Sequence, residues 1–157
     1  MTQIFEMIGI LFLIVFIVIG AVVDGLTPYR FIEDGDPLEA RIELVEIDGE
    51  FTYGDEDRLE DKVRVVCRIE NRSQFIGELK KLKNTSTRFG DPSYLVVGGR
   101  AFMLTYPNGN VELIGRIGTA YIVNGNMEVY DHYFEDEAFD AFWEAWANKS
   151  ETSSTAA

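Results

Sequence analysis

The 157-residue chain has one cysteine, one histidine and few basic side chains. A single cysteine excludes an internal disulfide and a cysteine-based zinc cluster, and a single histidine excludes a multi-histidine metal site. Lysine and arginine number 14 against 27 aspartate and glutamate residues, which gives a formal net charge of −13. Because binding to phosphates depends on basic side chains, this charge argues against nucleic acid as a partner.

Motifs that carry chemistry are equally scarce. No G-x-S-x-G pattern points to a nucleophilic serine, and no G-x-G-x-x-G or GK[ST] pattern points to a phosphate-binding loop, so we predict no cofactor. His132 lies in the run YDHYFEDE, and we interpret it as a strand-end surface histidine whose pKa is raised by the acids beside it. The sequence favours a protein without catalytic activity. An enzyme that uses carboxylates alone, such as a glycoside hydrolase, stays open because 27 acids supply many pairs.

The longest apolar run covers residues 7–23, MIGILFLIVFIVIGAVV, and has no charged, amide or hydroxyl side chain. A helix of this length spans roughly 25 Å, close to the thickness of about 30 Å of a bilayer core. The preceding segment MTQIFE has no lysine or arginine, and the exit GAVVDG is a poor cleavage site. We therefore predict that residues 1–23 form a retained, single-pass transmembrane anchor in contact with lipid, and not a cleaved signal peptide.

The side of the membrane on which the rest of the chain lies is left open. Arg30 and Arg41 follow the apolar run and no basic side chain precedes it, which weakly favours a cytoplasmic domain. The free thiol of Cys67 agrees, since reducing compartments tolerate lone cysteines.

Composition divides the remainder of the chain into three parts. Residues 24–38 contain two glycines and two prolines among acids and suit a linker. Residues 39–148 carry the periodic patterns of a folded domain. Residues 149–157, the small and polar KSETSSTAA end after Asn148, are predicted to be a disordered tail.

The first half of the domain predicts two strands and a helix. Residues 39–47 suit a strand, and residues 48–61 form a long acidic connection. The alternation in residues 62–70 predicts a half-buried strand that turns Cys67 toward the core, where a thiol is inert packing. Asn71 then begins a helix, with Gln74 three positions on as its capping partner.

The second half predicts a series of hairpins followed by a helix. Glycine-containing turns separate five short strands, since Gly-Gly and Asn-Gly pairs supply the positive φ of hairpin turns. The strands are residues 94–97, 100–106, 111–117, 119–123 and 126–130, with turns at Gly98-Gly99, Asn108-Gly109, Gly118 and Asn124-Gly125. In residues 135–147, Phe139, Phe142, Trp143 and Trp146 form one apolar helix face. Together these patterns predict an α+β domain in which a twisted antiparallel sheet, a hairpin meander, is covered by two helices.

An acidic cluster in the connection is the candidate partner-binding site. Its five members lie within seven residues, namely Asp55, Glu56, Asp57, Glu60 and Asp61. Calcium is a poor fit, since the spacing matches no EF-hand loop and the glycine at the sixth position is missing. No metal site is predicted.

The charges are unevenly distributed along the chain. Residues 24–61 hold 14 acids and three bases, residues 62–116 hold 10 bases and four acids, and residues 117–149 hold seven acids and one base. Two explanations are open. The basic middle can pair with its acidic flanks, or the acidic cluster can dock a basic protein partner steered by charge.

The sequence leaves two hypotheses of function. The first is a membrane-anchored, non-catalytic protein-binding module, of which an immunity-type inhibitor of a toxin is one form. The alternative is an accessory subunit of a larger membrane protein complex, in which the anchor packs against other helices.

Overall fold

A computed structural model describes residues 29–32, 35–82, 84–85 and 97–154 of the chain. The predicted membrane segment, residues 7–23, lies outside these ranges. No helix within the described ranges is long and apolar enough to cross a bilayer.

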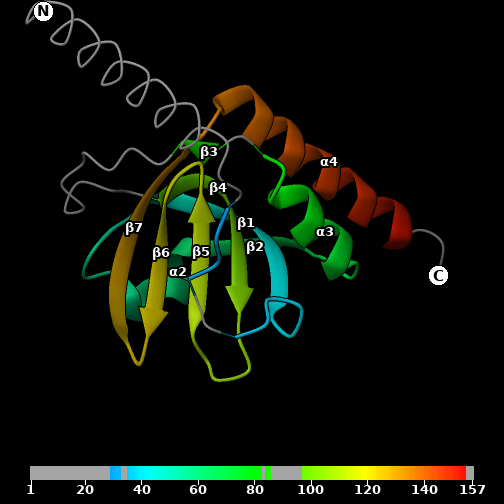
Figure 1. Cartoon of the computed structure of the whole chain (residues 1–157). Coiled ribbons are helices and arrows are strands. Elements are labelled where there is room, and N and C mark those ends of the chain that lie inside the picture. The colour runs from blue at the N-terminus through cyan, green and yellow to red at the C-terminus, as the bar shows by residue number, and fades with distance from the viewer. Residues whose placement is uncertain (1–28, 33–34, 83, 86–96, 155–157) are drawn as a thin grey trace, which may run out of the picture.

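The described residues form an α+β fold around one antiparallel sheet of seven strands in the order β2-β1-β4-β5-β6-β7-β3 (Figure 1). The strands are β1 (Arg41–Phe51), β2 (Val63–Arg68), β3 (Asn84–Thr85), β4 (Val97–Thr105), β5 (Val111–Gly115), β6 (Ile117–Val123) and β7 (Asn126–Phe134). The helical segments are η1 (Glu56–Arg58), α2 (Leu59–Lys62), α3 (Arg72–Leu79) and α4 (Asp136–Ser154). The predicted α+β class and the antiparallel meander β4–β7 are confirmed.

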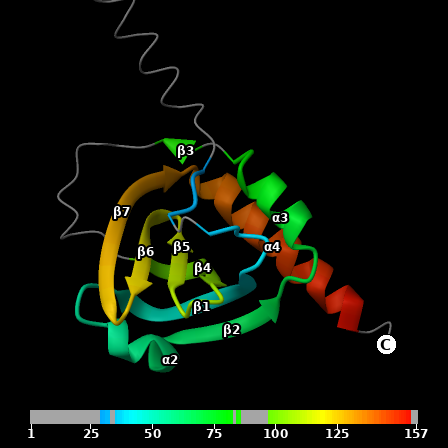
Figure 2. The ribbon, with the colours of Figure 1, turned by 60° about the horizontal axis from the view of Figure 1, so that its bottom comes forward.

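Both faces of the sheet are buried. Side chains alternate between faces along a strand, so Ile42 and Leu44 of β1 enter one cluster while Val45 and Ile47 enter another. The first, which we call the helix-covered cluster, includes Phe75 of α3 and faces both long helices. The second, which we call the inner cluster, contains residues of β1, β4, β6 and β7. These strands can contribute to one cluster because the sheet is strongly curved, and α2 lies at the lower edge of the sheet in Figure 2.

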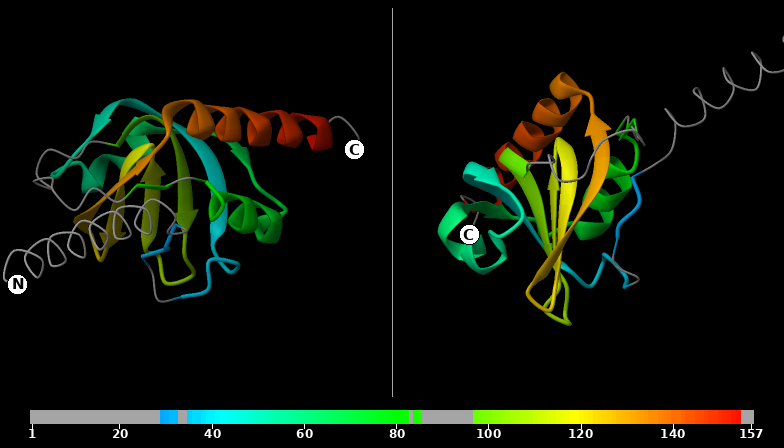
Figure 3. Two further views of the ribbon diagram at one scale, coloured as in Figure 1. Left: turned by 45° about the horizontal axis from the view of Figure 1, so that its top comes forward. Right: turned by 90° about the vertical axis from the view of Figure 1, so that its left-hand side faces the viewer.

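The helices α3 and α4 lie together on one face of the sheet, as predicted (Figure 3). Asn71 begins α3 as expected, because its Oδ1 accepts the Gln74 amide at 3.2 Å while its Nδ2 donates to Gln74 Oε1 at 3.0 Å. Trp146 of α4 donates from Nε1 to Glu78 of α3 at 3.0 Å, and its ring meets that of Phe75 at 5.5 Å. These contacts fix the two helices to each other as well as to the sheet.

The Gly98-Gly99 pair does not form the predicted hairpin. Both residues lie inside the continuous strand β4, where the pairing with β1 shifts register between Ile47 and Glu50. A Cβ on Gly98 would lie 3.0 Å from the carbonyl oxygen of Gly49, and Gly99 has a φ of +67°. Glycine is therefore required here by an irregularity between two strands, not by a turn.

Strand β2 departs from the predicted alternation at a bulge. Its pairing with β1 shifts between Leu44 and Val45, so that Cys67 and Val65 point to opposite faces. Cys67 is partly buried against the helix-covered cluster, whereas Val65 is 47% exposed. An alternating sequence pattern cannot show that a strand contains one extra residue, so the bulge could not be predicted from the sequence.

The structure also differs from the predicted ends of the domain. Tyr29, inside the predicted linker of residues 24–38, is buried in the helix-covered cluster. Helix α4 includes residues 149–154, which the composition assigned to a disordered tail. Lys149 continues the helix because its ammonium lies 4.1 Å from the Trp146 ring centroid and 3.5 Å from Glu78 Oε2.

Candidate functional site

Asp55, the first of the five predicted site residues, is a structural residue. It is only 8% exposed, and its Oδ2 accepts from Lys62 Nζ at 2.7 Å and from the Thr52 amide at 3.0 Å. The hydrogen bond from Lys62 is the main cause that lowers the pKa of the Asp55 carboxyl. Lys62 also donates to the Glu50 carbonyl at 2.7 Å, so this pair fastens η1 and α2 to the end of β1.

Lys62→Met should therefore destabilise the protein at neutral pH and raise the pKa of Asp55. A carboxyl with a lowered native pKa contributes stability above its unfolded pKa, and this contribution is lost as pH falls through the native pKa. The difference in free energy of unfolding between wild type and variant should accordingly shrink between pH 7 and pH 3, measured by urea unfolding. The exposed residue Lys81 provides the control, Lys81→Met. An equal deficit at both pH values would contradict the assigned role of the pair.

Glu60 and Asp61 line a groove that continues onto β1, which we call the acidic groove. Its volume is about 590 Å³, and its acidic residues are Glu46, Asp48, Glu60 and Asp61. Of the described basic residues that line it, Arg64 forms an ion pair with Glu46, and Lys62 forms one with Asp55. Among the described residues, Asp48, Glu60 and Asp61 form no ion pair, so no described cation neutralises these three carboxylates.

The remaining predicted site residues, Glu56 and Asp57, lie in η1 and do not line the acidic groove. Within the part of the chain that the structure describes, no three His, Cys, Asp or Glu side chains are grouped so that they could hold a metal ion. The acidic cluster of the sequence thus divides into one internal ion pair, two residues of the groove and two outside it.

A second cavity is lined by residues of α2 and of the inner cluster, and we call it the Glu43 pocket. Its volume is about 430 Å³, and it shares Glu60 and Val63 with the acidic groove. Its apolar wall consists of Leu59, Val63, Val65, Met103 and Val111. Its polar lining consists of Arg41, Glu43, Glu60 and Thr105.

Glu43 is the functional candidate that the sequence reasoning missed. It is 9% exposed, and its Oε2 has no hydrogen-bond partner. The Nε of Arg41 forms an ion pair with this oxygen at 3.2 Å, outside hydrogen-bond geometry. The alternation of side chains along β1 could have identified it, because Glu43 lies on the same face of the strand as the buried residues Val45 and Ile47.

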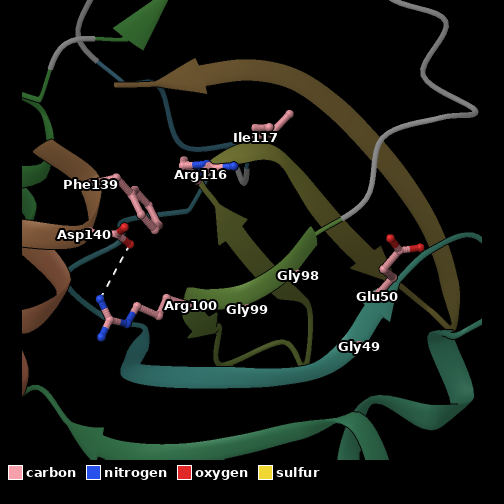
Figure 4. Close-up of a pocket in the computed structure, with 9 residues that line it drawn as sticks. All are labelled: Gly49, Glu50, Gly98, Gly99, Arg100, Arg116, Ile117, Phe139 and Asp140. Atoms are coloured by element: carbon pink, nitrogen blue, oxygen red, sulfur yellow. Dashed lines mark ion pairs between the residues drawn. The ribbon is translucent and has the colours of Figure 1, made fainter. Parts of the chain in front are cut away.

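A third cavity, about 600 Å³, lies where the β1–β4 irregularity approaches the start of α4 (Figure 4). Arg100 lies against Asp140 at 3.7 Å and Glu144 at 2.9 Å, and Arg116 pairs with Asp136 at 3.3 Å. Both described guanidinium groups that line this cavity thus form ion pairs with carboxylates of α4. Its described lining contains no His, Cys, Ser or Tyr.

His132 is not the surface residue that the sequence predicted. It is 4% exposed, and burial lowers its pKa to about 4, opposite to the expected direction. Its Nε2 lies 2.9 Å from the Gly115 carbonyl oxygen, which can only accept, and its Nδ1 lies 3.2 Å from Thr119 Oγ1. Strand β7 extends four residues past the predicted end at Tyr130, which places this ring inside the fold. With both nitrogens engaged, His132 is a structural residue.

A buried hydrogen-bond network continues from His132 to the start of the described chain. Thr119 Oγ1 lies 2.9 Å from Tyr29 Oη, which donates to Glu112 Oε1 at 2.6 Å. Tyr106 donates to Glu112 Oε2 at 2.7 Å. Burial, followed by the charge of Glu112, raises the pKa of Tyr29 well above its ordinary value. This network holds the segment around Tyr29 against the sheet.

No protein-family model matches the chain, and neither a curated protein nor a solved structure is significantly similar to it.

Proposed function

We propose that this protein is a non-catalytic binding module that docks a basic protein partner on the acidic groove, while residues 7–23 anchor it in a membrane. The acidic groove carries this proposal, because Asp48, Glu60 and Asp61 have no cation of the described chain to neutralise them. The overall charge of −13 would steer a basic partner toward it.

The positions of the charged side chains support docking of a basic partner over charge compensation within the chain. Where compensation occurs, it is visible in separate pairs such as Lys62 with Asp55 and Arg100 with Glu144. Glu60 and Asp61, by contrast, are exposed at the rim of a concave surface. Carboxylates at such a rim chiefly set partner choice and association rate.

The triple variant Asp48→Lys, Glu60→Lys, Asp61→Lys should lower capture of the partner from solubilised membranes at least tenfold. Its matched control is Glu39→Lys, Glu56→Lys, Asp57→Lys, which changes the net charge equally but leaves the groove intact. Crosslinking of the full-length chain followed by quantification of one basic protein measures the effect. An equal loss in both variants would show that net charge, and not the groove, is recognised.

Replacement of residues 7–23 by an unrelated apolar helix tests the alternative role. A binding module of the inhibitor type should retain capture of its partner, because the groove is unchanged. Loss of capture with a correctly folded domain would instead favour an accessory subunit whose anchor packs against other helices.

A further inference from the structure

We infer that the Glu43 pocket is the receptor for one lysine or arginine side chain of the basic partner. This inference rests on the proposed function, and it names the chemical group that a docked partner inserts beside the acidic groove. The pocket and the groove share Glu60 and Val63, so one partner segment can contact both.

The buried carboxylate is the first observation that points to a cationic ligand. Glu43 is 9% exposed, and its Oε2 makes no hydrogen bond. A buried polar oxygen that accepts no hydrogen bond is destabilising, and the cost is greater when the group is charged. A donor that enters from outside would remove this cost, so the site is prepared for a ligand with an N–H group.

The apolar wall of the pocket is the second observation, and it favours a ligand whose uncharged part is a hydrocarbon chain. Leu59, Val63, Val65, Met103 and Val111 form one side of the cavity. Val65 is 47% exposed at the edge of the sheet, so a hydrocarbon chain placed against it removes apolar surface from water. Lysine and arginine combine such a hydrocarbon stem with a terminal cation.

In the absence of a partner, Arg41 forms a weak ion pair with Glu43 at the place where the ligand's cation would bind. Its Nε lies 3.2 Å from Glu43 Oε2, while its side chain is 50% exposed. Because it pairs without hydrogen-bond geometry, it competes weakly for the carboxylate. Removal of Arg41 should therefore strengthen ligand binding, an outcome that a purely structural role for Glu43 does not predict.

The test uses the full-length chain in an uncharged detergent with n-butylguanidinium chloride as the probe of an arginine side chain. NMR titrations should shift the methyl signals of Met103 and Val65. Two probes serve as controls, because n-butanol has a stem without charge and guanidinium has a charge without a stem. We expect n-butylguanidinium to bind at least tenfold more tightly than either control.

Variants assign the binding to this pocket. Glu43→Gln should weaken n-butylguanidinium binding at least tenfold, and Arg41→Ala should strengthen it several-fold. Glu137→Gln changes one exposed carboxylate that lines none of the three cavities and should leave binding unchanged. If Glu43→Gln does not fold, the exposed substitution Val65→Ser should still weaken binding several-fold.

The outcomes separate this inference from the proposed function. Equal affinity for n-butylguanidinium and n-butanol, or unchanged affinity in Glu43→Gln and Val65→Ser, would overturn the pocket assignment. Capture of the basic partner that persists in Glu43→Gln but fails in the groove variant would also overturn it, while the proposed function would stand. Selective n-butylguanidinium binding without a capturable basic partner would support the pocket and refute the proposed function.

Discussion

Phe102→Ala should lower the free energy of unfolding by about 3–5 kcal/mol, a large share of the roughly 5–15 kcal/mol that stabilises a typical domain. Phe102 is fully buried on β4, and both long helices pack against its ring. The ring centroids of Phe75 in α3 and Phe139 in α4 each lie 5.2 Å from it. A cavity at this point would remove contacts from the sheet and from both helices together.

Phe142→Ala is the matched control for this prediction. The same chemical change is made in α4, but Phe142 is only partly buried at the margin of the helix-covered cluster. Its loss should cost clearly less than that of Phe102, since less apolar area is returned to water. Urea unfolding of both full-length variants measures the difference. Equal losses would show that the ring of Phe102 is not the central packing element of this face.

The sequence predicts the elements that depend on local chemistry. The N-terminal cap of α3 involves only Asn71 and Gln74, which are three positions apart. The Asn124-Gly125 turn has the positive φ values, 50° and 75°, that this dipeptide favours. The apolar face that Phe139, Phe142, Trp143 and Trp146 form on the last helix likewise follows from spacing alone. Each of these predictions involves neighbours in the chain.

The predictions that failed depend on partners distant in the chain. Gly98-Gly99 has the composition of a turn, but its conformation is set by the shift in strand pairing near Gly49 on β1. The acids beside His132 suggested a raised pKa, whereas contacts with Gly115 and Thr119 hold the ring inside the fold. Neither opposing strand can be identified from the local pattern.

Glu43 and Glu112 show how one sequence signal can have two meanings. Each is an acid among inward-facing apolar residues, and each is buried. Glu112 accepts from Tyr29, Tyr106 and the Ile32 amide, so it holds the fold together. Glu43 has an oxygen that accepts no hydrogen bond and pairs only with Arg41, beside a cavity. Only the hydrogen-bond partners distinguish a structural carboxylate from a receptor for a ligand.

Acidification should destabilise the protein through His132 by about 3 kcal/mol between roughly pH 6.5 and pH 4. Burial lowers the pKa of this histidine to about 4 in the folded protein, whereas the unfolded chain titrates near 6.5. Below pH 6.5 the unfolded state therefore gains a proton that the native state does not bind. The stability present above pH 6.5 is lost as pH falls, and the loss ends near the native pKa.

His132→Gln should remove this slope, because a glutamine amide can donate to the Gly115 carbonyl oxygen as the ring does and does not titrate. The free energy of unfolding of both proteins is measured by urea at several pH values, and only their difference is interpreted, since Asp55 and Glu78 with lowered pKa values affect both alike. NMR offers an independent readout, as the chain has one histidine whose signals need no assignment by mutation. At pH 6 the ring should be neutral with its hydrogen on Nε2, the tautomer that the Gly115 oxygen requires. A doubly protonated ring at that pH, or parallel pH profiles of the two proteins, would contradict the buried neutral state.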